Sequence, residues 1–363
     1  MKKNKNYVDL KDQPVPEGQH LLEVDDLKMY FHTEDGVVRA VDGVSYTLDR
    51  GETLGVVGES GSGKSVTAMT IMGLISMPPG KIEGGDVRYR GRSILEMTEE
   101  EMQHIRGNDI AMIFQDPMTS LNPVYKIGKQ VGEGLRLHRG YSKQEALKRA
   151  TELLDLVGIP EPEKRVNEYP HQFSGGMRQR VMIAMALACD PDILIADEPT
   201  TALDVTIQAQ IIDLMQEMQE KNGNAIIMIT HDLGVVADMA DKIMVMYAGR
   251  PVEFGTAEEI FYESRHPYTW GLIRSIPEQA IEEKKPLTPI HGNPPSLMNL
   301  PEGCVFSPRC PYATDKCRKQ RPERVVTESG HYSACHYSGD PEFLKNAPET
   351  SRTRKDSKKG GEA

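Results

Sequence analysis

The chain has 363 residues, and its 43 Lys and Arg against 54 Asp and Glu give a formal net charge of −11. This acidic balance excludes a basic protein that coats nucleic acid, and the length suggests one large domain plus something smaller. The longest uninterrupted apolar stretch, residues 181–189, is far shorter than the roughly 20 residues that a helix needs to cross a bilayer. The N-terminal residues do not follow the pattern of a secretory signal, so we expect an intracellular chain.

The first half of the chain predicts strands on both sides of a glycine-rich turn, followed by a helical insert. Apolar periodicity and turn residues predict, in chain order, strands at 21–31, 37–48 and 53–57, a helix at 65–75, short strands near 88–90 and 110–114 with a helical run between them, and the insert at 124–157. In the insert, one apolar face is predicted from Ala146, Ala150, Leu153, Leu154 and Val157.

The second half alternates strands and helices. The predicted order is a helix near 176–188, a strand at 193–196, a helix at 205–221, a strand at 225–229, a short helix, and a strand at 242–246. Alternation at these lengths predicts a mostly parallel sheet covered by helices, and therefore an α/β fold.

The composition changes after this alternating region. Eight prolines lie between Pro277 and Pro311, which indicates a linker and an irregular module. We therefore expect four segments: a flexible N-terminus at 1–20, a large domain at 21–255, a smaller C-terminal module at 256–340 and a disordered tail at 341–363.

A phosphate-binding loop is predicted where G-E-S-G-S-G-K-S matches G-x-x-x-x-G-K-[ST] between a predicted strand and a predicted helix. A Gly/Ser linker is the alternative, and it does not explain the flanking strand and helix. The glycines let successive N–H groups point at phosphate oxygens, while the helix N-terminus adds its positive dipole. Lys64 would reach the β- and γ-phosphates, and Ser65 would offer a hydroxyl to Mg²⁺. The expected ATP-binding residues are Gly58, Glu59, Ser60, Gly61, Ser62, Gly63, Lys64, Ser65 and Val66.

A magnesium site also needs a carboxylate, and two acids follow the apolar strand at 193–196. Asp197 is the candidate ligand of Mg²⁺, directly or through water. Glu198 would face the γ-phosphate and polarise the attacking water as a general base. Taken alone, both acids could equally cap the next helix.

Two further polar residues follow predicted strands. His231 comes after the strand at 225–229, and Gln115 comes after the strand at 110–114. Ligands of α/β proteins bind at the carboxyl ends of strands, which favours catalytic roles for both. The Gln115 carbonyl could bind Mg²⁺. The alternatives are a structural histidine and an ordinary turn glutamine.

The segment S-G-G-M-R-Q-R, about 110 residues after the phosphate-binding loop, resembles the signature motif of the ATP-binding-cassette (ABC) family. Phe173 stands where Leu is usual and Met177 stands where Gln is usual, which leaves the Ser-Gly-Gly unchanged. A serine hydroxyl and glycine amides at a helix N-terminus form a second anion site, although alone they would be a capping turn. The resemblance implies that the ATP of a partner subunit is contacted by Ser174, Gly175, Gly176 and Met177.

The other ABC motifs follow in the family's order over about residues 21–255. The resemblance implies these roles: Gln115 in the Q-loop, Asp197 and Glu198 as the Walker B pair, Asp204 in the D-loop and His231 as the switch histidine. It implies a P-loop NTPase nucleotide-binding domain with an antiparallel β subdomain and a helical subdomain at about 116–175. An aromatic ring should stack on adenine, and Phe31 is the first candidate and Tyr30 the second. A strand residue in the core is the alternative for either.

Four of the five cysteines are crowded near the C-terminus, in a segment that follows H-P-Y-T and resembles the extension of oligopeptide and dipeptide permease ATPases. Their spacing is C-x₅-C-x₆-C-x₁₇-C, at Cys304, Cys310, Cys317 and Cys335. Four thiolates suit tetrahedral Zn²⁺ or an iron–sulfur cluster, and the spacing separates these poorly from each other and from a site without metal. The family resemblance implies a [4Fe-4S] cluster.

The resemblance implies the ATP-hydrolysing subunit of an importer for oligopeptides or dipeptides. One ABC module cannot complete a site, so we expect a second ATPase subunit, as a heterodimer or homodimer. We also expect two membrane permease subunits, an extracytoplasmic binding protein and a position on the cytoplasmic face of the cell membrane. The alternatives are an importer of nickel or another solute, and a soluble ABC ATPase that acts on nucleic acid or ribosomes. The chain lacks the second cassette or long coiled-coil insertion usual in the last class.

Overall fold

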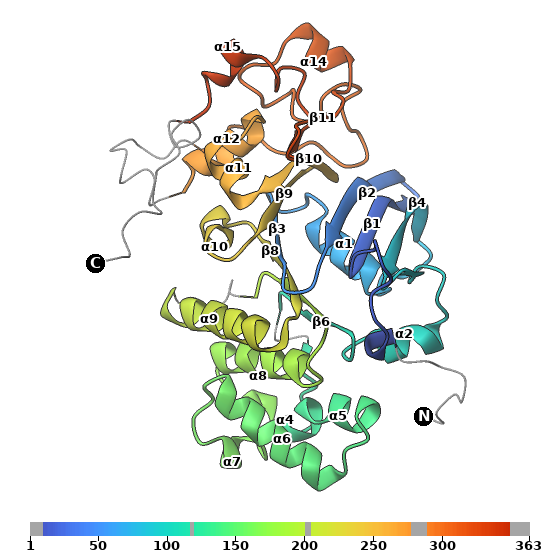
Figure 1. Ribbon diagram of the computed structural model, residues 1–363, viewed down its shortest axis with the longest axis vertical. Helices are drawn as coiled ribbons and strands as arrows, with labels where there is room; N and C mark the ends of the chain where they lie inside the picture. Colours follow the sequence, from blue (N-terminus) through green and yellow to red (C-terminus); the bar gives the residue numbers. More distant parts are fainter. Residues whose placement is uncertain (1–9, 117–119, 200–204, 277–288, 349–363) are drawn as a thin grey trace.

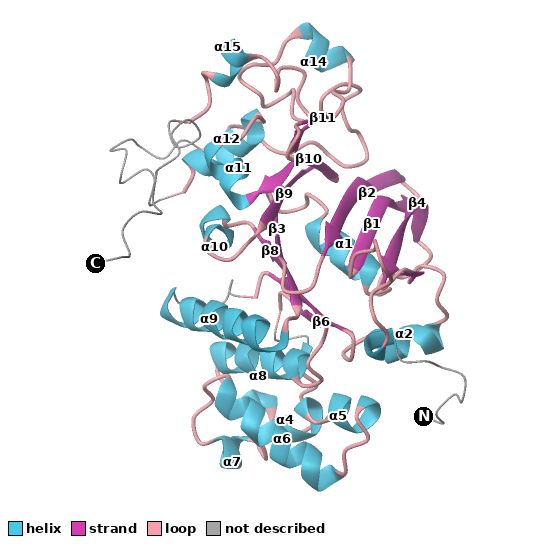
Figure 2. Cartoon of the chain, in the orientation of Figure 1, coloured by secondary structure: helices cyan, strands magenta, loops and turns pink. Residues whose placement is uncertain are grey.

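The computed structural model describes residues 10–116, 120–199, 205–276 and 289–348. Its N-terminal part is a four-stranded antiparallel sheet in the order β2-β1-β4-β5, which lies to one side of the molecule in Figures 1 and 2. The strands are β1 (Leu22–Thr33), β2 (Gly36–Leu48), β4 (Gly80–Tyr89) and β5 (Arg92–Ser93). The two predicted N-terminal strands are confirmed as β1 and β2, which pair antiparallel.

The second sheet has eight strands in the order β11-β12-β10-β9-β3-β8-β7-β6. Its bounds are β3 (Thr53–Val57), β6 (Ile110–Ile113), β7 (Ile193–Asp197), β8 (Ala225–Thr230), β9 (Lys242–Tyr247), β10 (Arg250–Thr256), β11 (Val325–Val326) and β12 (Tyr332–Ser333). The five strands from β9 to β6 are parallel, as the alternation predicts, and β10, β12 and β11 continue the sheet antiparallel.

The two faces of this sheet belong to two different apolar clusters. In β7, Ile193 and Ile195 pack in the cluster that includes the antiparallel sheet, whereas Leu194 and Ala196 pack in the cluster of the helical subdomain. All four side chains are fully buried. Because successive side chains of a strand point to opposite faces, one apolar strand serves both cores.

The helices before the C-terminal region fall into two groups. Those packed near the sheets are α1 (Lys64–Ile71), α2 (Glu99–Ile105), α9 (Val205–Asn222) and α10 (Leu233–Ala237). Those of the helical subdomain, below the sheet in Figure 1, are α4 (Ile127–Val131), α5 (Glu133–His138), α6 (Lys143–Leu156), α7 (Pro162–Arg165) and α8 (Gly175–Leu187). Two 3₁₀ turns are Leu10–Asp12 and Pro170–Gln172.

The predicted insert at 124–157 is divided into α4, α5 and α6. The break between α4 and α5 falls at Gly132, and Gly140 adopts a positive φ of 70° before α6. A capping box of Ser142 and Glu145 then starts α6. The predicted apolar face is confirmed, since Ala146, Ala150, Leu153, Leu154 and Val157 are all buried.

The C-terminal region, residues 257–348, is not separate from the large sheet. It contains α11 (Ala257–Tyr262), α12 (Pro267–Arg274), α14 (Asp315–Lys319) and α15 (Pro341–Leu344), as well as β11 and β12. Strand β12 pairs with β10, and the amide of Arg39 in β2 donates to the carbonyl of Leu297. This region therefore contacts both sheets. None of the described helices is long and apolar enough to cross a bilayer.

Candidate nucleotide-binding site

The predicted phosphate-binding loop joins β3 to α1. Gly63 has a φ of 99°, and a Cβ there would lie 2.3 Å from the carbonyl oxygen of Ala40. Only glycine fits this position, because an added Cβ meets backbone that cannot move aside. The buried hydroxyl of Ser62 has no hydrogen-bond partner within the described residues. The loop therefore presents its backbone and an unpaired hydroxyl, as a phosphate cradle requires.

The ammonium of Lys64 lies folded across this loop. Its Nζ donates to the carbonyl oxygens of Gly58 at 2.6 Å and Glu59 at 3.0 Å, and the side chain is buried. Burial lowers the pKa of Lys64, while the nearby carboxylates of Glu198 and Asp197 oppose this shift. An ammonium group whose hydrogen bonds go to neutral carbonyls, with no direct ion pair among the described contacts, is well placed to bind phosphate oxygens.

Ser65 and Asp197 lie next to each other although they are 132 positions apart. The Ser65 hydroxyl donates to Asp197 Oδ1 at 3.0 Å. Asp197 is buried at the end of β7, and this burial raises its pKa. A hydroxyl and a carboxylate from two elements supply the oxygen donors that Mg²⁺ prefers, so the pair fits the predicted metal site.

Gln115, Glu198 and His231 converge. The Gln115 amide Nε2 donates to Glu198 Oε2 at 2.9 Å, and His231 Nδ1 lies 3.4 Å from Glu198 Oε1. Glu198 has a positive φ of 47°, and its amide donates to the carbonyl of Ile229. A non-glycine residue in this region is strained, and such strain is concentrated at functional sites.

The parallel sheet explains this convergence. The ends of neighbouring strands are level, since Val57 is paired with Thr230 and Asp197 with Ile229. The phosphate loop, His231, the acid pair and Gln115 therefore follow β3, β8, β7 and β6 at one edge of the sheet. Carboxyl ends of parallel strands form the ligand-binding edge of α/β proteins.

Comparison with known proteins identifies the family. The family model described as ABC transporter matches residues 41–201. The chain is 58% identical over 312 residues to the oligopeptide transport ATP-binding protein OppD of Bacillus subtilis, covering 86% of this chain and 87% of the relative. The chain belongs to the ABC transporter family. As a member it is an ATPase that uses ATP and Mg²⁺, and the predicted ABC fold is confirmed.

Other relatives agree with this assignment. The chain is 52% identical to the dipeptide transport ATP-binding protein DppD of Escherichia coli, over 88% of this chain and 97% of the relative. The family model described as oligopeptide/dipeptide transporter, C-terminal region, matches residues 252–317. A solved ABC cassette dimer in a post-hydrolysis state with ADP and Pi is similar with a TM-score of 0.60 and 29% identity, covering 65% of this chain and 98% of that one.

The ABC signature segment lies at the start of α8. Ser174 is the N-cap, and its exposed hydroxyl accepts a hydrogen bond from the Met177 amide at 3.3 Å. Gly175 is also exposed, and a Cβ there would meet nothing within 4 Å. Phe173, at the position where the ABC signature usually has Leu, is buried in the core of the helical subdomain. The segment therefore presents a helix N-terminus on the surface, as contact with a partner's nucleotide would require.

Tyr30 and Phe31, the two candidates for stacking on adenine, have different neighbours in the structure. The Tyr30 hydroxyl donates to Asp42 at 2.9 Å, and Asp42 is also paired with Arg250. Burial, with help from Asp42, raises the pKa of Tyr30 to about 12. Phe31 is half-buried and, like Val66, packs against the cluster that includes the antiparallel sheet. The choice between the two rings stays a prediction.

Asp204, the predicted D-loop residue, lies outside the described residues.

Two residues that contact the phosphate-binding loop, Tyr268 and Arg309, were not predicted from the sequence. The carboxylate of Glu59 is paired with Arg309, and its amide donates to the hydroxyl of Tyr268 at 2.9 Å. Both partners belong to the C-terminal region, more than 200 positions away. No periodicity or motif spacing links them to the loop, so sequence patterns carry no signal for this contact.

The four C-terminal cysteines line one small cavity of about 20 Å³. Burial raises the pKa of Cys304, raises the pKa of Cys310 to about 11 and raises that of Cys335 to about 12, with the neighbouring cysteines adding to the shift. Within the described residues, no group of three or more His, Cys, Asp and Glu side chains is already arranged to hold a metal ion. The four cysteines therefore gather around one cavity, and no disulfide joins them within the described residues.

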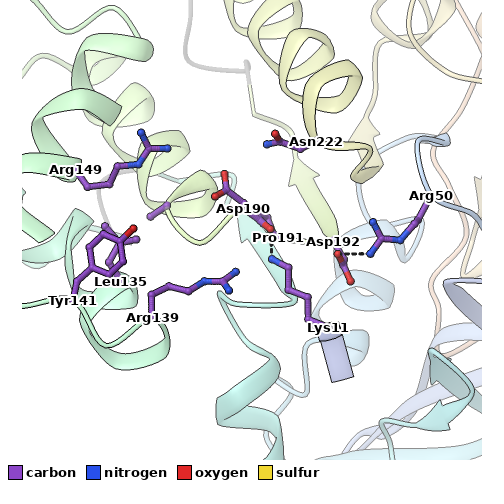
Figure 3. Close-up of a pocket in the computed structure, with 11 residues that line it drawn as sticks. Lys11, Arg50, Leu135, Arg139, Tyr141, Arg149, Asp190, Pro191, Asp192 and Asn222 are labelled. Carbon is purple, nitrogen blue, oxygen red and sulfur yellow. Dashed lines mark hydrogen bonds and ion pairs between the residues drawn. The ribbon is translucent and has the colours of Figure 1, made fainter. Parts of the chain in front are cut away.

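A cavity of about 550 Å³ lies at the amino end of β7, opposite the carboxyl end that carries the candidate nucleotide site (Figure 3). Two positively charged side chains that line it, Lys11 and Arg139, both donate to the carbonyl of Cys189, just after the end of α8, at 3.1 and 2.7 Å. Carbonyls at a helix C-terminus lack helical partners and attract cations. Arg50 is paired with Asp192 at 2.9 Å. These contacts account for Lys11, Arg50 and Arg139 as support for the fold.

Proposed function

We propose that this chain hydrolyses ATP to drive the import of oligopeptides or dipeptides. One observation carries the proposal: a region matching the ABC transporter family and a region matching the C-terminal region of oligopeptide/dipeptide transporters lie on one chain. The names of the relatives, an oligopeptide and a dipeptide transport protein, support the same cargo class.

Each residue at the edge of the sheet has a role in this proposal. Lys64 holds the β- and γ-phosphates, and Ser65 and Asp197 bind Mg²⁺. Glu198 orients the attacking water and accepts its proton. Gln115 and His231, which contact the two carboxylate oxygens, keep this side chain facing the γ-phosphate. Such positioning lowers the entropic cost of reaction.

The proposed assembly has a second ATPase subunit, two membrane permease subunits and an extracytoplasmic peptide-binding protein, with this chain on the cytoplasmic face of the membrane. The exposed N-terminus of α8 supports the ATPase pairing, because Ser174 and Gly175 lie on the surface there, where a partner's nucleotide could reach them. Exposed apolar side chains around α4–α6 support the docking of a membrane subunit. They are Val124, Tyr125, Leu137, Leu147 and Leu156.

Reconstitution tests the proposed cargo. The chain, co-purified with its permeases, is placed in liposomes with the binding protein, and uptake of labelled di- and tetrapeptides is measured with and without ATP. We expect ATP-dependent peptide uptake, with the Glu198→Gln variant as the inactive control. Uptake of nickel but not peptide, or co-purification with ribosomes and no permease, would overturn the proposal.

We further propose that Cys304, Cys310, Cys317 and Cys335 bind a [4Fe-4S] cluster. The support is that all four thiols face one cavity in a region with little regular structure. Bound metal would hold the thiols as thiolates against their raised pKa and would cross-link the irregular segments that carry the four cysteines. Zn²⁺ would suit the same four donors.

Anaerobic purification followed by iron, sulfide and zinc assays separates these outcomes. We expect about four iron and four sulfide per chain. Cys310→Ser should lose this content, whereas Cys189→Ser, a buried cysteine at the end of α8, should keep it. Stoichiometric zinc without sulfide would overturn the cluster, and a metal-free protein would overturn any metal at this site.

A further inference from the structure

The phosphate-binding loop carries a carboxylate that should oppose ATP. Glu59 is the second residue of the loop, and its side chain is about one quarter exposed. A negative charge close to the phosphates of ATP raises the cost of binding them unless it is compensated. The only positively charged side chain in the loop sequence is Lys64, and its charge is already needed for the phosphates.

Arg309 of the C-terminal region compensates this charge. Its Nη1 lies 2.5 Å from Glu59 Oε2 and its Nη2 lies 2.9 Å from Glu59 Oε1, which makes a bidentate pair. Two parallel N–H···O bonds fix orientation as well as charge. Hydrogen bonding to Glu59 raises the pKa of Arg309, which therefore stays charged at any relevant pH.

Arg309 is held rigidly. Its side chain is only 4% exposed, its Nε donates to the carbonyl of His291 at 2.9 Å, and its Nη2 donates to the carbonyl of Ile290 at 3.1 Å. The guanidinium also lies 5.7 Å from the centre of the Tyr247 ring. A buried, fully bonded guanidinium has few alternative positions, so it fixes the carboxylate that it contacts.

The main chain of Glu59 is held by the same region. The hydroxyl of Tyr268 in α12 accepts its N–H at 2.9 Å, and Tyr268 is fully buried. The Tyr268 ring packs against Phe306 with centroids 5.4 Å apart. Phe306 lies in the turn that carries Cys304 and Cys310, and its carbonyl accepts the amides of both Arg309 and Cys310. One turn therefore contains Cys304, Cys310 and Arg309, and its Phe306 packs against Tyr268, the second contact to the loop.

We propose that Arg309 is a positioning residue of the nucleotide site, through which the cysteine-bearing turn at 304–310 sets the affinity of the phosphate-binding loop for ATP. Arg309 neutralises Glu59 and holds it away from the phosphates. The proposal concerns the pair itself and holds whether or not the cysteines bind a metal.

A double-mutant cycle tests the pair. The dissociation constant of MgATP is measured by calorimetry on the purified chain for the wild type, Arg309→Gln, Glu59→Gln and the double variant. Arg309→Gln should weaken binding about 10- to 100-fold, because it leaves Glu59 uncompensated. The double variant should recover most of this loss, since the opposing carboxylate is gone.

If Arg309 were purely structural, the double variant would not recover its affinity for MgATP. A double variant as weak as Arg309→Gln alone, or an unchanged affinity in Arg309→Gln, overturns the proposal. Should Arg309→Gln fail to fold, Arg309→Lys keeps the charge but loses the bidentate geometry and should weaken binding by a smaller factor. Arg318→Gln is the matched control, because Arg318 forms an exposed pair with Asp315 in the same region and should leave ATP affinity unchanged.

The turn is tested in the same assay. Cys310→Ser should weaken ATP binding in the wild-type background and have a smaller effect in the Glu59→Gln/Arg309→Gln background, because the connecting pair is absent there. An equal effect in both backgrounds, or no effect in either, overturns the role of the turn. Metal content measured on the same samples separates this result from the proposed cluster.

Discussion

The side-chain amide of Gln115 donates a 2.9 Å hydrogen bond to the carboxylate of Glu198, a residue 83 positions away. His231 approaches the other carboxylate oxygen at 3.4 Å. One acid is thus contacted from both neighbouring strand ends, close to the hydrogen-bonded pair of Ser65 and Asp197 that we propose binds Mg²⁺. This arrangement favours a single oriented base rather than an acid that merely caps a helix.

Glu198→Gln should bind ATP normally and hydrolyse it about 10²- to 10⁴-fold more slowly, because the amide keeps the shape but cannot accept a proton. Phosphate release by the assembled transporter and ATP affinity of the isolated chain measure the two effects. Glu220→Gln, on the far end of α9, is the control. Normal turnover in Glu198→Gln would remove Glu198 from the role of base.

Asp197→Asn should stabilise the nucleotide-free protein while it abolishes Mg²⁺-dependent hydrolysis. Burial raises the pKa of Asp197, so its contribution to stability is present below the unfolded value of about 3.9 and is lost as pH rises through the higher folded value. At neutral pH the buried carboxylate therefore costs stability.

The neutral amide removes this cost and should raise the free energy of unfolding by about 0.5–2 kcal/mol. Chemical denaturation at pH 7 measures this change. The gain should shrink near pH 3, where the wild-type carboxyl is protonated. A loss of stability at pH 7 would contradict the prediction.

Gly63→Ala should destroy ATP binding. Its φ of 99° is costly for alanine by about 1–2 kcal/mol, and its Cβ would lie 2.3 Å from the carbonyl oxygen of Ala40. The loop must therefore shift away from the phosphates. Gly339→Ala is the control, since nothing lies within 4 Å of a Cβ there. Binding of a fluorescent ATP analogue reports the difference, and equal affinities in the two variants would refute it.

Ser174→Arg should leave ATP binding by the isolated chain intact and reduce hydrolysis in the assembled transporter more than tenfold. The reason is that Ser174 lies exposed at the N-terminus of α8, where an arginine would block a partner's nucleotide. Ser142→Arg is a matched control, because Ser142 is the N-cap of α6 and loses about the same 0.5–2 kcal/mol of capping. Equal hydrolysis by both variants would count against the partner contact.

Much of this site could be predicted from the sequence alone. The loop motif, the acids after a strand and the signature segment are local patterns, because each depends on a turn of fixed backbone shape between two elements. The parallel sheet also made the grouping of Gln115 and His231 predictable, since every strand brings its carboxyl end to one edge.

The tertiary structure alone decided the contacts of the C-terminal region. The sequence indicates an irregular module after residue 255, and nothing in it predicts that β12 extends the sheet or that Arg309 reaches Glu59 across 250 positions. Periodicity records which face of a regular element is buried. The position of an arginine in an irregular turn depends instead on side-chain packing and on the need of a buried charge for a partner, which only the folded chain supplies.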